Sequence, residues 1–162
     1  MATNPRDHAR RVLETFWRGR DFPVDPAKIA NDMGIDVFIG KLPGNVSGAL
    51  IKQRCQDPAI FLNADDSKPR QRFSCGHELG HYIARLADQS DVYEYADFRG
   101  EESRSGTDPD EIFANQFAAE LLMPIDEVKR LHSQGHPSYV IAHHFGVSDD
   151  AINFRLKNLK LA

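Results

Sequence analysis

Apolar residues recur at helical spacing in four parts of the N-terminal three quarters of the chain. The first pattern covers about residues 7–18. A short second helix is expected after the pair Asp25-Pro26, because aspartate suits an N-cap and proline suits the first turn. Longer helical patterns cover about residues 69–86 and 110–122, and the last of these ends at Met123-Pro124.

Three short runs are typical of strands because they are rich in β-branched residues or alternate in polarity: 35–39, 46–52 and 59–62. Turn-forming residues separate them, as in Leu42-Pro43-Gly44-Asn45, so we expect a small, mostly antiparallel sheet. Residues 92–99 are expected to add another short strand at the sheet edge.

The last forty or so residues favour three short helices, with breaks near residues 135–137 and 145–148. The order of elements predicts an α+β fold. We expect a compact core in residues 1–124, with the sheet packed on the 69–86 helix, and a C-terminal helical segment in residues 125–162 packed on that core.

Composition narrows the possible partners and surroundings. The chain has 162 residues, 41% of them hydrophobic, and a net charge of −4, so overall charge does not favour binding to nucleic acid or anionic membranes. It has two cysteines, too few for a disulfide framework. The polar start of the chain does not resemble a signal peptide, and no apolar run is long enough for a membrane span. A cytoplasmic protein with reduced thiols is expected.

The 69–86 helix carries the sequence His77-Glu78-Leu79-Gly80-His81. Residues four apart lie on one helical face, so the two imidazoles can bind one ion, and Zn²⁺ is the expected metal. Glu78 lies beside that ion and is the expected catalytic base, because it can take a proton from a metal-activated water and pass it to a leaving amine. The alternative is a charged helix with two incidental histidines.

Two imidazoles alone make a weak zinc site, so a third ligand is needed. A histidine six residues after His81 is excluded because Ala87 stands there. The remaining carboxylate candidates are Glu94, Asp97, Glu101, Glu102, Glu111 and Glu120. Glu111 is favoured because it opens the next helix, whose apolar face is expected to pack on the first. It can equally serve only to stabilise that helix N-terminus.

Asn115 lies one turn after Glu111 on the same face. Its amide can form a hydrogen bond that orients one of the ligand imidazoles.

The motif and the later run Glu111-x-x-Ala114-Asn115-x-Phe117-Ala118-Ala119-Glu120-Leu121-Leu122-Met123-Pro124 together resemble the ImmA/IrrE family of metallopeptidases. The resemblance covers about residues 10–160. It implies a zincin-like fold with His77, His81 and Glu111 as zinc ligands and Glu78 as catalytic base. Better-known members are bacterial or phage-borne and cleave helix-turn-helix repressors, which induces genes for mobile-element transfer or stress responses. The resemblance therefore implies a repressor as the protein substrate.

The sequence says less about the other residues near the motif. Cys75 is expected to be buried and inert, and Cys55 has no assigned role. The candidates for stabilising an oxyanion are Tyr82, Tyr93, Tyr95, Arg99 and the C-terminal histidines, and the sequence does not decide among them.

Residues 141–156 resemble a helix-turn-helix. Its second helix, however, begins with Asp149 and Asp150, which phosphates would repel, and only Arg155, Lys157 and Lys160 offer compensating charge. A structural helical pair is the favoured interpretation, and direct DNA binding is not.

The leading hypothesis is a zinc-dependent endopeptidase that cleaves a helix-turn-helix transcriptional repressor. The alternative is a non-proteolytic regulator that binds a repressor or DNA and has a structural or vestigial metal site. A third hypothesis is that the protein is a toxin-like partner of an adjacent small regulator.

Overall fold

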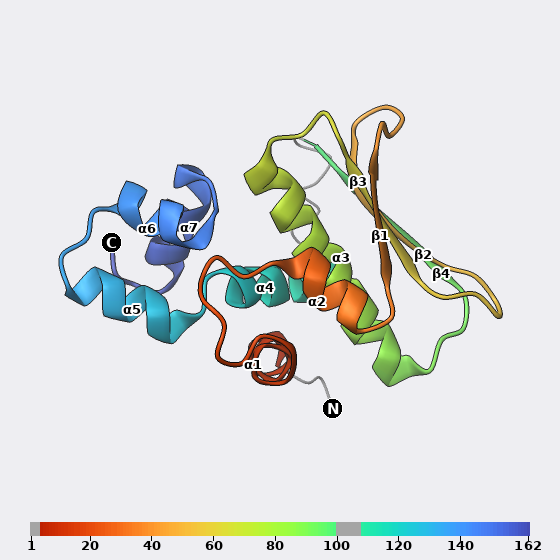
Figure 1. Cartoon of the computed structure of the whole chain (residues 1–162), viewed down its shortest axis with the longest axis horizontal. Helices are drawn as coiled ribbons and strands as arrows, with labels where there is room; N and C mark the ends of the chain where they lie inside the picture. The colour runs from red at the N-terminus through yellow and green to blue at the C-terminus, as the bar shows by residue number, and fades with distance from the viewer. Residues whose placement is uncertain (1–3, 100–107) are drawn as a thin grey trace.

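The structure is a computed structural model that describes residues 4–99 and 108–162 (Figure 1). Its helices are α1 Pro5–Phe16, α2 Pro26–Asp32, α3 Lys68–Asp88, α4 Pro109–Leu122, α5 Ile125–Ser133, α6 Ser138–Phe145 and α7 Asp149–Asn158. Its strands are β1 Asp36–Gly40, β2 Val46–Lys52, β3 Ala59–Asn63 and β4 Tyr93–Phe98. The expected α+β fold is confirmed, and each expected helix and strand is present.

The helix N-termini form where short polar residues can cap them. Asp25 accepts hydrogen bonds from the backbone N–H groups of Ala27 and Lys28, at 3.1 and 3.2 Å, as the Asp25-Pro26 pair predicts. Ser67 caps α3 by accepting from the N–H of Arg70 at 3.3 Å. These local contacts set where α2 and the site-bearing helix α3 begin.

The four strands form one sheet in the order β1-β3-β2-β4. β2 pairs antiparallel with both β3 and β4, whereas β1 pairs parallel with β3, with Phe38 opposite Phe61. The expected small, mostly antiparallel sheet is confirmed, but β1 and β2, although consecutive in the chain, are not neighbours, because β3 lies between them. Strand patterns report which residues are extended but not which strand is the neighbour. β4 lies at the edge, as predicted.

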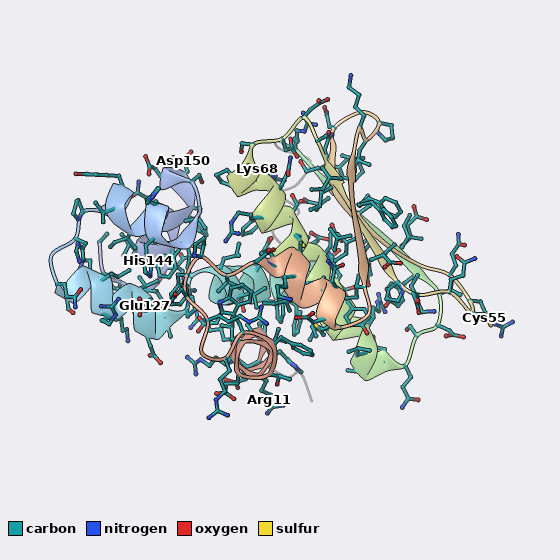
Figure 2. The ribbon with its side chains drawn as sticks, in the orientation of Figure 1. Arg11, Cys55, Lys68, Glu127, His144 and Asp150 are labelled. Atoms are coloured by element: carbon teal, nitrogen blue, oxygen red, sulfur yellow. The ribbon has the colours of Figure 1, made fainter. Side chains whose placement is uncertain are left out.

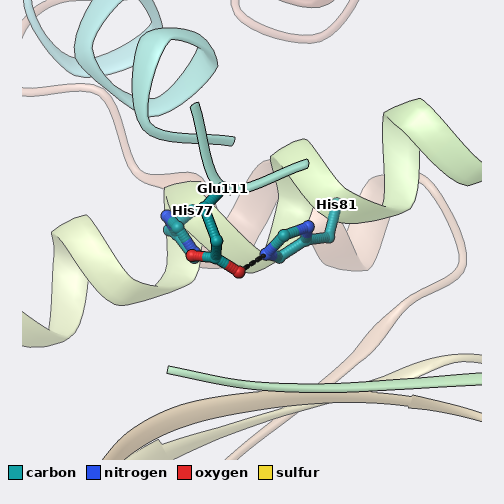
Figure 3. Close-up of side chains that lie close together, drawn as sticks. All are labelled: His77, His81 and Glu111. Atoms are coloured by element: carbon teal, nitrogen blue, oxygen red, sulfur yellow. Dashed lines mark ion pairs between the residues drawn. The ribbon is translucent and has the colours of Figure 1, made fainter. Parts of the chain in front are cut away.

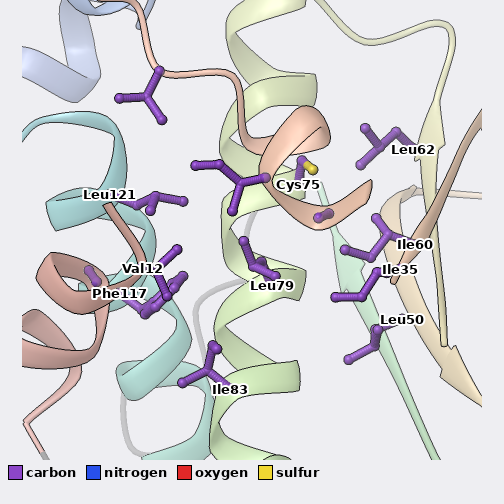
Figure 4. Packing of buried hydrophobic residues seen from close by; sticks show 14 residues of the cluster. Val12, Ile35, Leu50, Ile60, Leu62, Cys75, Leu79, Ile83, Phe117 and Leu121 are labelled. Atoms are coloured by element: carbon purple, nitrogen blue, oxygen red, sulfur yellow. The ribbon is translucent and has the colours of Figure 1, made fainter. Parts of the chain in front are cut away.

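Helix α3 lies between the sheet and the pair α1 and α4 (Figure 1). Its buried side chains Cys75, Leu79 and Ile83 belong to one hydrophobic cluster with residues of the sheet and of α4 (Figure 4). From the sheet this cluster includes Leu50, Ile60 and Leu62, and from α4 it includes Phe117 and Leu121. The site-bearing helix is thus held on two sides by the core.

Two glycines allow α4 to approach α3 closely. A Cβ at Gly80 would lie 2.9 Å from Ala114 Cα and 3.2 Å from the Ala114 carbonyl oxygen. A Cβ at Gly76 would lie 3.3 Å from that of Ala118. Both glycines lie on the face of α3 that packs against α4, so the absence of side chains sets the spacing of the two helices.

Gly80→Ala is expected to lower the free energy of unfolding by about 1–3 kcal/mol, because the new methyl group meets the α4 backbone and the helices must move apart. Urea denaturation measures the change. Gly40→Ala is the matched control, since no described atom outside its neighbours lies within 4 Å of a Cβ there. Equal stability of the two variants would contradict the tight α3–α4 approach.

The C-terminal helices enclose a second hydrophobic cluster, which includes Leu122, Val128, Ile141, Phe145 and Ile152. A polar contact also joins two of these helices, because the Glu127 carboxylate of α5 lies 3.0 Å from Nε2 of His144 of α6 (Figure 2). The division of the chain at residue 124 stays a prediction.

Two arginines, the half-buried Arg72 and the buried Arg155, join the C-terminal helices to the core. Arg72 of α3 donates hydrogen bonds to the carbonyls of Val24, Phe145 and Gly146. Arg155 of α7 pairs with Glu120 of α4. The relative position of α3, α4 and α7 is therefore set by directional polar contacts as well as by apolar packing.

Within the described residues, no helix combines the length and apolar character needed to cross a membrane.

Candidate metal centre

Helix α3 directs His77 and His81 toward one point, because their four-residue spacing places them on one face. The two rings are nearly perpendicular, with centroids 4.8 Å apart. Both side chains are almost fully buried, at 2% and 1% exposure. The pair is thus fixed by the core rather than free at the surface.

Glu111 of α4 completes the set (Figure 3). Its Oε2 lies 3.0 Å from His77 Nε2, and its Oε1 lies 3.0 Å from His81 Nε2. These contacts hold the pKa of the Glu111 carboxyl well below its usual range, although partial burial opposes the effect. Among the described residues, this is the one group of three His, Cys, Asp or Glu side chains close enough to share a metal ion.

Glu111 also lies in the first turn of α4, where a carboxylate suits the helix dipole. That helix already has an N-cap, because Asp108 accepts a hydrogen bond from the N–H of Asp110 at 2.9 Å. The end of the helix therefore does not need Glu111 as its cap, and the carboxylate turns to the two imidazoles instead.

Asn115 orients His77. Its Oδ1 lies 2.8 Å from His77 Nδ1. An amide oxygen only accepts, so the contact favours the tautomer with hydrogen on Nδ1 and leaves the Nε2 lone pair directed at Glu111. That Nε2 is buried and has no hydrogen bond of good geometry from the described residues, which fits a nitrogen arranged for a cation.

His81 is oriented differently. The Tyr95 ring of β4 stacks on it, with centroids 3.9 Å apart and planes 8° from parallel. The His81 Nδ1 is buried and finds no hydrogen-bond partner among the described residues. The orientation of this second imidazole therefore depends on ring stacking.

Arg85 holds Tyr95 in place. Its Nε donates to the Tyr95 hydroxyl, and its Nη2 pairs with Asp110, 3.3 Å away and directly before Glu111. Arg85 thus connects the three elements α3, β4 and α4. The sequence interpretation missed it, although its position four residues after His81 places it on the same helical face.

Glu78 is fully buried beside the three residues, and neither of its carboxylate oxygens has a hydrogen-bond partner among the described residues. Burial raises the pKa of this carboxyl well above its usual value, and the nearby Asp97 and Glu111 add to the rise. A buried carboxylate without a partner is costly, so its retention fits a role in chemistry.

The other carboxylates that were candidates for a third ligand are engaged elsewhere. Asp97 accepts a hydrogen bond from Arg70 at 3.2 Å, and Glu120 pairs with Arg155. Glu94 is exposed on β4. The two remaining candidates, Glu101 and Glu102, lie outside the described residues.

Cys75 of α3 is buried, and burial raises the pKa of its thiol to about 12, so it stays protonated and unreactive at neutral pH. Cys55 is exposed.

The oxyanion candidates are mostly committed to other contacts. The Tyr95 hydroxyl meets Arg85, and Arg99 pairs with Asp66 at 2.9 Å. Tyr82 and Tyr93 pack against the core cluster.

A helix with two histidines and a glutamate, packed on a small mixed sheet and facing a second glutamate on the next helix, defines a zincin-like domain. The chain belongs to the family described as the IrrE N-terminal-like domain, a peptidase family, whose model matches residues 30–157. The resemblance to the ImmA/IrrE family is confirmed.

A search of curated proteins found no match. Among solved structures, a Mycobacterium tuberculosis transcriptional regulator has the same fold, with a TM-score of 0.64 and 18% identity. The match covers 94% of the chain and 46% of the regulator, so the chain spans less than half of that protein's length.

Proposed function

We propose that the chain is a zinc-dependent endopeptidase that cleaves a helix-turn-helix transcriptional repressor. The observation that carries the proposal is a buried, unpartnered Glu78 carboxylate beside the converging set of His77, His81 and Glu111. Membership of a peptidase family and the fold shared with a transcriptional regulator support the peptidase and the regulatory parts, respectively.

The donor set fits zinc. Two imidazole nitrogens and one carboxylate leave a position open for water or substrate, as in catalytic rather than structural zinc sites. Zinc held there supplies a Lewis acid that polarises the scissile carbonyl and lowers the pKa of a water molecule.

The chain's own residues supply the proton transfers. Glu78 takes the proton from the attacking water and delivers it to the leaving amine. Burial raises the pKa of Glu78 and so makes it a stronger base toward the attacking water. Asn115 and Tyr95 keep the two imidazoles in place while this happens.

The direct test combines metal content with cleavage. Protein purified without chelators should carry about one zinc per chain, and it should cleave at a single region a helix-turn-helix repressor drawn from the same genome. Chelation should stop cleavage, and added zinc should restore it. Metal-free protein that gains no activity with zinc would overturn the proposal.

Removing the ring that stacks on His81 is expected to weaken zinc binding. Tyr95→Leu should raise the zinc Kd about 10–100-fold, the usual cost of losing a group that orients a ligand. Competition with a chromogenic chelator measures the Kd. Tyr95→Phe should bind zinc nearly as well as the unaltered protein, because the ring remains.

Tyr93→Leu is the matched control for that experiment, since Tyr93 lies on the same strand and packs against the same core. If both leucine variants bound zinc equally, stacking on His81 would have no special role.

A further inference from the structure

A groove of about 950 Å³ lies between the N-terminal half of α3, the part of α4 from Asn115 onward, and α7. In Figure 2 Lys68 marks the α3 end and Asp150 marks the facing α7. Sites for drug-sized ligands occupy about 300–1,000 Å³, so the groove has room for several residues of a polypeptide. The proposed chemistry above makes no use of it.

The groove runs along the same helical faces that carry the metal-centre residues. Phe73 lies in it one turn before His77, and the two ring centroids are 6.4 Å apart. Asn115 lies in it one turn after Glu111 and contacts His77. The groove therefore has two of its lining residues beside His77, and a chain lying along it would approach the metal centre.

Apolar side chains form part of the lining of the groove, among polar ones. They include Phe73, Met123, Val147, Ala151 and Phe154. Phe154 of α7 is 67% exposed, and it is the large apolar side chain that the C-terminal helices offer to an occupant. Such a surface suits aliphatic or aromatic side chains of a partner.

The charges that line the groove largely neutralise one another. Arg70 pairs with Asp97, and Arg155 pairs with the adjacent Glu120. Arg6 and Asp150 remain, with opposite signs. A polyanion would find no net positive field here, so the lining favours a polypeptide over a nucleic acid.

We infer that α7 forms the far wall of a substrate groove, in which Phe154 binds an apolar side chain several residues from the scissile bond. The helix-turn-helix-like segment then serves recognition of the protein substrate. This inference rests on the proposed peptidase function and adds to it the part of the chain that selects the substrate.

The test profiles cleavage of a proteome-derived peptide library by the zinc-loaded protein. We expect a preference for apolar residues at a position beyond those flanking the scissile bond. Phe154→Ser should erase that preference and lower kcat/KM about tenfold on a decapeptide that carries leucine there. A tetrapeptide too short to reach α7 should be cleaved at an unchanged rate.

Tyr139→Ser is the matched control, because Tyr139 of α6 is 66% exposed and is not among the described residues that line the groove. Its cleavage profile should equal that of the unaltered protein. Since both replaced side chains are exposed, both variants should keep their thermal stability.

The outcomes separate the two claims. If the unaltered protein cleaves no peptide with zinc bound, the proposed peptidase function fails, and the inference fails with it. If it cleaves but Phe154→Ser leaves both the profile and the decapeptide rate unchanged, the groove alone is overturned.

Discussion

Glu78→Gln is expected to lower kcat/KM for peptide cleavage by about 10²–10⁴-fold, the contribution of a positioned general acid–base group, while zinc binding persists. The amide keeps the shape of the side chain but cannot accept the proton from water. The ligands His77, His81 and Glu111 are unchanged by the substitution. Zinc content and cleavage of the repressor are measured on the same preparation.

The same substitution should stabilise the metal-free protein at neutral pH. Because the folded-state pKa of Glu78 lies above its unfolded value, the folded state binds more protons, and stability falls as pH rises from the unfolded pKa toward the folded one. Glutamine does not ionise and so removes that loss of stability. The free energies of unfolding of the two metal-free proteins should therefore differ at pH 7 and converge below about pH 4. Normal cleavage by Glu78→Gln would contradict the assignment of Glu78 as the base, whereas normal gene regulation by a variant that cannot cleave would favour the non-proteolytic regulator.

Arg155→Met is expected to lower the free energy of unfolding by about 3–5 kcal/mol, the cost of removing one partner from a buried ion pair. Arg155 is 4% exposed and donates two hydrogen bonds to the Met123 carbonyl, at 3.1 and 2.9 Å, besides pairing with Glu120. Without it, the buried Glu120 keeps the Ile125 N–H at 3.3 Å and Arg10 Nε at 3.4 Å, both on Oε1, and loses its buried ion-pair partner. Urea denaturation followed by circular dichroism measures the loss.

Lys157→Met is the control, because Lys157 is an exposed cation on the same helix. Its stability should change by less than about 0.5 kcal/mol. The double variant Glu120→Gln/Arg155→Met should be more stable than the sum of the single effects, since no buried charge is left alone. Strict additivity would show that Arg155 and Glu120 do not act as a pair.

The burial of Arg155 also changes the interpretation of the helix-turn-helix-like segment. The sequence counts it with Lys157 and Lys160 as charge available to phosphates. In the structure its guanidinium is directed into the molecule and neutralised by Glu120. The available positive charge beside Asp149 and Asp150 is therefore smaller than the sequence suggests.

Features that depend on residues close together in the chain could be predicted from the sequence alone. The cap at Asp25, the start of β2 at Val46 and the His77–His81 spacing each depend on residues within a few positions of one another. Propensity, capping and helical periodicity act over that range, so the pattern determines them without a partner.

Only the tertiary structure shows where the Glu111 carboxylate lies relative to the two histidines. The sequence left Glu111 open between a helix-terminus role and a ligand role, and the close crossing of α3 and α4 at Gly80 brings its two oxygens to the two imidazoles. The parallel β1–β3 pairing and the stack of Tyr95 on His81 were likewise hidden. Such contacts join residues distant in the chain, and they depend on how whole elements pack, which local patterns do not encode.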